Sequence, residues 1–95
     1  MDALDLSRRL RRLRRAVDML QADLRQRYVN EQLLGEIEKQ MEHGIATDAR
    51  CTGLRTHVDT LRENTLTPRP ELLVDTARAC EQLKFAIDGV VNVLH

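Results

Sequence analysis

Apolar residues recur along the first quarter of the chain at alternating intervals of four and three residues. This spacing places them on one stripe of an α-helix, as narrow as the seam of a coiled coil. We call this stripe the leucine seam; its members are Leu6, Leu10, Leu13, Val17, Leu20 and Leu24. The pattern predicts that these side chains form either an internal core or the interface with another copy of the chain.

A second apolar stripe follows after a change of phase. The next positions in phase with the leucine seam are Arg27 and Glu31, so the strict repeat ends there. Residues 28–30 are where a helix could kink or break, and Gly44 suits its C-terminal end. The stripe resumes at Leu33, Leu34, Ile37 and Met41. We expect one long helix over residues 3–43, which would span about 60 Å if continuous.

A second helix is predicted over residues 48–64. Thr47 or Asp48 can cap its N-terminus, because both side chains carry an oxygen that accepts from free backbone N–H groups. The apolar positions again follow a three-and-four spacing, at Cys51, Leu54, Val58 and Leu61. Pro68 disfavours helical geometry in the residue before it, so the segment around it reads as a connector.

A third helix is predicted over residues 70–94. Pro70 fits a first helical position, because its missing N–H has no partner to lose there. One face is apolar almost to the end, at Leu73, Ala77, Cys80, Leu83, Ile87, Val90, Val91 and Leu94. Leu72, Val74, Phe85 and Val93 widen this face beyond half of the circumference. Such a helix is either central in a bundle or in contact with a second subunit.

These elements predict an all-α fold in a single domain, residues 1–95. Short connections favour an antiparallel three-helix bundle with a long N-terminal helix. The first helix is too long for its two partners and the third is too apolar for a small bundle alone. We therefore expect a homo-oligomer.

Charge is distributed unevenly, although the net charge is zero. Residues 1–27 hold eight arginines against four aspartates, and residues 28–95 hold seven cations against eleven carboxylates. Cations near a helix N-terminus oppose the macrodipole, and like charges four residues apart repel. We therefore expect a counter-charge outside the first helix for the arginine cluster, which comprises Arg8, Arg9, Arg11, Arg12, Arg14 and Arg15.

Three partners would suit the arginine cluster. One is a second copy of the chain, offering acidic residues such as Glu36, Glu38 and Glu42. Another is an acidic protein surface or an anionic membrane, which a basic amphipathic helix fits. The alternative is nucleic acid, in which a regulator would place the residues of Arg8–Arg15 on phosphates. Zero net charge and only two aromatic residues argue against nucleic acid. We expect a protein–protein interaction module: an adaptor, chaperone-like protein, inhibitor or regulator.

Catalytic and metal-binding chemistry is not indicated. The candidate ligands Cys51, Cys80, His43, His57 and His95 match no standard zinc or copper spacing. The chain has a single serine and no glycine-rich phosphate loop. We therefore expect no enzyme activity, no cofactor and no metal. No apolar run reaches the length of a membrane span and no signal segment is present, so we expect a cytoplasmic protein.

Overall fold

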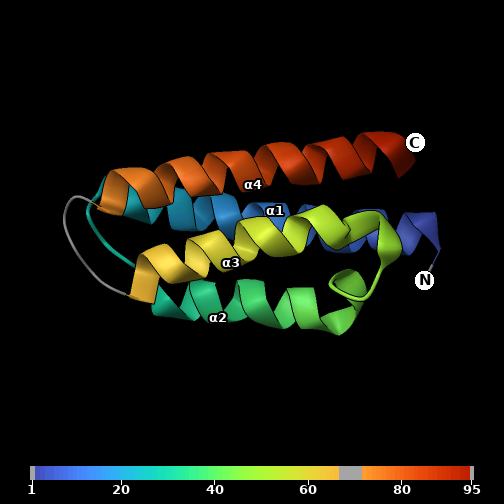
Figure 1. Cartoon of the computed structure of the whole chain (residues 1–95), viewed down its shortest axis with the longest axis horizontal. Coiled ribbons are helices and arrows are strands. Elements are labelled where there is room, and N and C mark those ends of the chain that lie inside the picture. The colour runs from blue at the N-terminus through green and yellow to red at the C-terminus, as the bar shows by residue number, and fades with distance from the viewer. Residues whose placement is uncertain (1, 67–71, 95) are drawn as a thin grey trace.

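The computed structural model describes residues 2–66 and 72–94, which form four α-helices (Figure 1). They are α1 (Ala3–Arg25), α2 (Glu31–Gln40), α3 (Thr52–Leu66) and α4 (Leu72–Leu94), with a π-type turn at Met41–Ile45 and a 3-10 turn at Ala49–Cys51. The described part contains no strand, so the predicted all-α class is confirmed. No helix in these ranges is both long and apolar enough to cross a bilayer.

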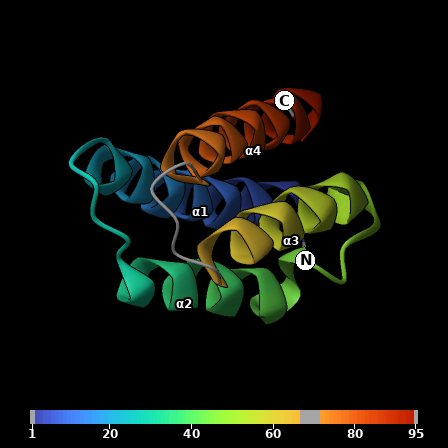
Figure 2. The same cartoon turned by 60° about the vertical axis from the view of Figure 1, so that its left-hand side comes forward.

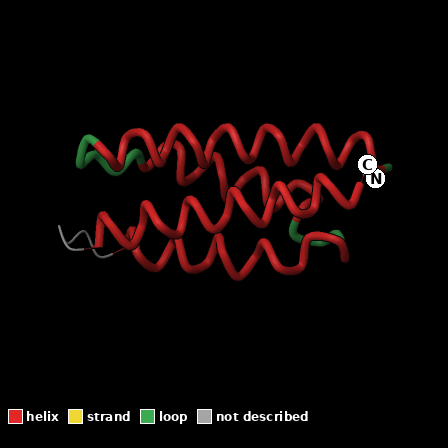
Figure 3. Tube along the Cα trace, turned by 90° about the horizontal axis from the view of Figure 1, so that it is seen from above, coloured by secondary structure: helices red, strands yellow, loops and turns green. Residues whose placement is uncertain are grey.

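The four helices run alternately in opposite directions along one axis. The start of α1 and the end of α4 therefore lie at the same end of the bundle (Figures 1 and 3). α1 lies between α4 and α2, and α4 also packs on α3 (Figure 2). The molecule measures 40 × 20 × 18 Å. A helix of 23 residues is about 35 Å long, so α1 and α4 each run almost the full length.

All four helices and both turns contribute to one core. α1 supplies the leucine seam and Ala16, and α4 supplies four buried residues opposite it. The remaining buried apolar residues come from α2, the two turns and α3: Ile37, Met41, Ile45, Cys51, Leu54, Val58 and Leu61. Because α2 and α3 are shorter than α1 and α4, the α1–α4 pair forms the backbone of the bundle.

The single helix expected over residues 3–43 is wrong, because the chain turns back between α1 and α2. Arg27 adopts a positive φ of 61°, a conformation that L-residues avoid within helices. The Asn30 side chain then accepts a hydrogen bond from Leu33 N at 3.2 Å and caps α2. The loss of phase after Leu24 therefore marks a break, and the predicted three-helix bundle becomes an arrangement of four helices in the described chain.

The other ends follow local chemistry. Gly44, the expected helix stop, has a φ of 101°, which glycine adopts without steric cost. Asp48 caps the next turn by accepting from Arg50 N at 2.9 Å. α3 continues to Leu66, two residues beyond the expected end. The expected helix start at Pro70 and the connector around Pro68 lie outside the described residues.

We predict that Asn30→Ala lowers the free energy of unfolding by about 1 kcal/mol, the usual cost of losing an N-cap. The same substitution removes the hydrogen bond from Asn30 Nδ2 to Asp23 Oδ2, which ties the start of α2 to α1. Urea unfolding followed by circular dichroism measures the difference. Asn30→Ser keeps a capping oxygen and should retain most of the stability, so an equal loss in both variants would contradict the capping role.

Candidate functional site

The leucine seam lies inside the molecule. Each of its six side chains is at most 3% exposed. They pack on buried residues of the other helices within one chain. The seam is therefore internal and offers no surface to a second copy.

The arginine cluster is divided by the helical geometry of α1. Arg14 lies on the α4 side, where its Nε donates to Asp88 Oδ1 at 2.8 Å. This hydrogen bond raises the pKa of Arg14. Arg9 lies on the α2 side, where Nη1 donates to the carbonyl oxygen of His43 at 2.6 Å. Arg11 is exposed. The predicted contact residues Arg9 and Arg14 are thus engaged within the chain.

Three arginines point away from the core. Arg8, Arg12 and Arg15 are exposed, and within the described ranges their side chains form no hydrogen bond or ion pair. At about 100° per residue they lie within about 60° of one another and roughly opposite the leucine seam. Leu4 and Met19 fall on the same side of the helix and are 58% and 52% exposed. We call these five residues the outer α1 face: Leu4, Arg8, Arg12, Arg15 and Met19.

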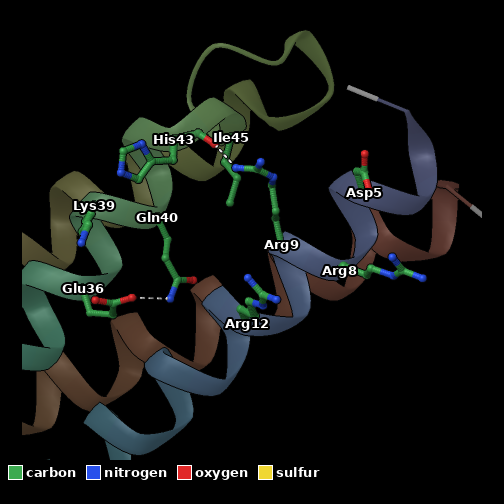
Figure 4. Close-up of a pocket in the computed structure, with 9 residues that line it drawn as sticks. All are labelled: Asp5, Arg8, Arg9, Arg12, Glu36, Lys39, Gln40, His43 and Ile45. Atoms are coloured by element: carbon green, nitrogen blue, oxygen red, sulfur yellow. Dashed lines mark hydrogen bonds between the residues drawn. The ribbon is translucent and has the colours of Figure 1, made fainter.

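A hollow of about 450 Å³ lies beside the outer α1 face, between α1 and α2. In Figure 4, Arg9 reaches the His43 carbonyl, and Arg12 lies further along α1, across from Gln40 of α2. We call it the basic hollow; its lining residues are Asp5, Arg8, Arg9, Arg12, Glu36, Lys39, Gln40, His43 and Ile45. It exists only because α2 folds back along α1.

The basic hollow has more cations than carboxylates. Four arginine or lysine side chains line it, against Asp5 and Glu36. Glu36 accepts a hydrogen bond from Gln40 Nε2 at 3.0 Å, while Gln40 Oε1 is buried without a partner in the described chain. Arg9 is committed to His43, and the Arg8 guanidinium points away from Gln40 in Figure 4, so Arg12 is the lining guanidinium with available donors on the α2 side. The excess of cations suits a negatively charged group, whereas Gln40 Oε1 is an acceptor and suits a donor.

A second polar group joins α1 to α4 and was not anticipated from the sequence. Lys84 is buried, and its Nζ lies 3.0 Å from Asp18 Oδ1 and 3.3 Å from Glu81 Oε2. Burial lowers the pKa of Lys84, but hydrogen bonds to the two carboxylates outweigh this effect and raise it overall. Gln21, also buried, donates to Glu81 at 2.9 Å. Lys84 lies one turn from the apolar Cys80 and Ile87, a signal that could have indicated its burial.

The cysteines occupy core positions rather than a reactive site. Cys51 and Cys80 are free thiols with no exposed surface. Burial raises the pKa of Cys80 to about 12 and also raises that of Cys51, which disfavours the thiolate needed for nucleophilic attack or metal binding. Over residues 2–66 and 72–94, no three His, Cys, Asp or Glu side chains are grouped to hold a metal ion. His95 lies outside these ranges.

We predict that stability falls in acid through the Lys84 contacts. The hydrogen bond from Lys84 lowers the pKa of Asp18, and those from Gln21 and Lys84 lower the pKa of Glu81. A lowered carboxyl pKa stabilises the fold above the ordinary values of 3.8 and 4.5, and this contribution is lost as pH falls through the folded pKa. As the pH is lowered from about 5.5 to about 3, the urea midpoint of unfolding should fall less in Lys84→Met than in the unsubstituted protein.

Lys39→Met provides the matched control, because Lys39 is exposed and forms no ion pair in the described chain. Its acid sensitivity should equal that of the unsubstituted protein. Asp18 and Glu81 keep half or more of their side-chain surface in solvent, so Lys84→Met strands no buried charge and should fold. Identical slopes in all three proteins would contradict the assignment.

Comparison of the chain with models of known protein families, with curated proteins and with solved structures found no match. The character of the site is given by its own residues: three exposed arginines between two exposed apolar side chains, beside a hollow with an excess of cations.

Proposed function

We propose that the protein is a non-enzymatic interaction module that binds an acidic surface of another protein through the outer α1 face and the basic hollow. The observation that carries this proposal is the exposure of Arg8, Arg12 and Arg15, none of which forms an ion pair in the described chain. Arg8 and Arg12 repel each other four residues apart, so an external carboxylate stabilises α1 as well as the complex. Adaptor, chaperone-like, inhibitory and regulatory roles all fit such a surface.

A nucleic-acid-binding regulator is the alternative, and one feature favours protein over phosphate. Leu4 and Met19 flank the basic surface with exposed apolar side chains, which a protein partner can bury. The cytoplasmic location expected from the sequence stays a prediction.

Self-association is a second proposal, and it now depends on α4 alone. The length mismatch that favoured an oligomer is absent, because α1 and α4 both have 23 residues. Phe85 and Val93, however, are 72% and 83% exposed and flank Gly89 at intervals of four. A Cβ at Gly89 would meet nothing within 4 Å, so another helix can approach closely there. An antiparallel crossing at Gly89 would place Phe85 against Val93 of the partner subunit.

We predict that exchanging Arg8, Arg12 and Arg15 for glutamate abolishes binding of an acidic protein partner. The protein would be immobilised and exposed to nuclease-treated lysate of the cells that make it, with retained proteins eluted by a salt gradient. The triple variant should retain none of the salt-eluted proteins. It should also fold, because the new carboxylates would lie three or four residues from the remaining Arg9 and Arg11, a favourable spacing on a helix.

Arg55→Glu is the matched control, since Arg55 is an exposed arginine on α3, away from the proposed surface. It should retain the same proteins as the unsubstituted chain. A labelled DNA or RNA duplex tests the alternative directly. If the unsubstituted chain binds the duplex, the triple variant does not, and no protein is retained from the lysate, the nucleic-acid proposal replaces the protein one.

For self-association, light scattering at micromolar concentration should give twice the chain mass of 11.0 kDa. Phe85→Glu should return the protein to a monomer, because a carboxylate would be buried in the apolar crossing. Val74→Glu, also at an exposed apolar position of α4 but more than two turns away, should leave the dimer intact. A monomer in the unsubstituted protein would rule out the α4 interface.

A further inference from the structure

The outer α1 face has the spacing of a helix-packing seam. Its five residues follow intervals of four, four, three and four, and they lie within about 80° of the helix circumference. The leucine seam uses the same kind of spacing on the opposite side of α1 to pack against other helices of the bundle. α1 therefore carries two helix-packing stripes, and the described chain covers the leucine seam but leaves the outer α1 face exposed.

The apolar members of this face lie at its ends. Leu4 and Met19 are 15 residues apart, which corresponds to about 22 Å along α1. Both are more than half exposed. Between them lie the three exposed arginines, so the stripe is apolar, basic and apolar in turn. A complementary partner is apolar, acidic and apolar over the same length.

The basic hollow adds a deeper feature beside the centre of this stripe. Arg8 and Arg12 belong both to the outer α1 face and to the lining of the hollow, and Arg12 is the nearer of the two to the centre of the stripe. Gln40 Nε2 is held by Glu36 and Arg9 by the His43 carbonyl, which fixes the surrounding side chains (Figure 4). A carboxylate of the partner that enters the hollow would meet Arg12 among side chains that are already held in place. The Arg12 guanidinium can form two parallel hydrogen bonds with a carboxylate.

We propose that the partner segment is an acidic α-helix laid along α1, with apolar residues at its ends on Leu4 and Met19 and one central carboxylate beside Arg12 in the basic hollow. This inference rests on the protein-binding role proposed for the same surface. An amphipathic helix fits better than an extended segment, because its three-and-four spacing matches that of the outer α1 face. Because the basic hollow has more cations than carboxylates, we infer that the centre of the partner helix is acidic.

Three synthetic peptides of 20 residues test the proposal. The first is helical, with leucines 15 residues apart and glutamates at the intervening seam positions. The second replaces both leucines with alanine, and the third differs from the first only in one central residue, which is replaced by a proline that breaks the helix. Fluorescence anisotropy at low ionic strength should rank the first above both others by about tenfold or more, as expected for burying two apolar anchors on a preformed helix.

Substitutions on the protein locate the contacts. Leu4→Ala with Met19→Ala should weaken the first peptide by about tenfold and leave the second unchanged, because both side chains are exposed and removing them opens no cavity. Arg12→Gln should weaken the first peptide more than Arg15→Gln does, because Arg12 lines the hollow and Arg15 does not. Circular dichroism confirms that each variant stays folded.

The outcomes separate this inference from the proposed function. If all three peptides bind equally and through the arginines, the acidic protein role stands and the helical partner is wrong. If no peptide binds, and the arginine variants retain the same cellular proteins as the unsubstituted chain, both proposals fail. Arginine-dependent binding that favours a DNA or RNA duplex over all three peptides also overturns the helical partner. If the first peptide binds best but Leu4→Ala with Met19→Ala has no effect, the peptide lies elsewhere and the inference fails.

Discussion

Burial of the leucine seam is the constraint on which the rest of this structure depends. α1 presents it along nearly the whole bundle, and α4, α2 and α3 each gain a buried face by packing on it or beside it. Fully burying each leucine contributes about 1.5–3 kcal/mol, which outweighs the unfavourable repulsion among the arginines of the same helix. The rotation of α1 is thereby fixed, and the directions in which its arginines point are fixed with it.

The polar contacts between α1 and α4 refine this arrangement. Arg14 pairs with Asp88, and Lys84 meets Asp18 one turn further along α1. Most of these side chains keep part of their surface in solvent, so each pair contributes little to stability by itself. Their positions on both sides of the interface hold the two long helices in one register. The flank of α1 that faces α4 is thus paired within the chain, which leaves the outer α1 face as its basic surface.

The sequence predicted the helical class and the leucine seam, because both depend on periodicity along a helix. It marked residues 28–30 as a possible break but did not predict that the chain turns back between α1 and α2. Neither Arg27 nor Tyr28 is a residue type that forbids a helix, and the turn is favoured instead by the burial of Ile37 and Met41 once α2 folds back. The division of the arginines could have been worked out from their angles on α1. The basic hollow could not, since its second wall exists only in the folded-back arrangement.

The shortness of α2 affects the stability of the wall that α2 forms in the basic hollow. A helix of ten residues is unstable alone in water, so α2 is held chiefly by Ile37, by the partly buried Leu33 and Leu34 and by the turn that follows it. Among the described helices it has the smallest share of the core and is therefore the natural unit of local opening. Any ligand that fills the space between α1 and α2 binds only the closed form. Its affinity is then linked to the folding of α2, and occupancy slows amide hydrogen exchange in a helix that the ligand touches on one side only.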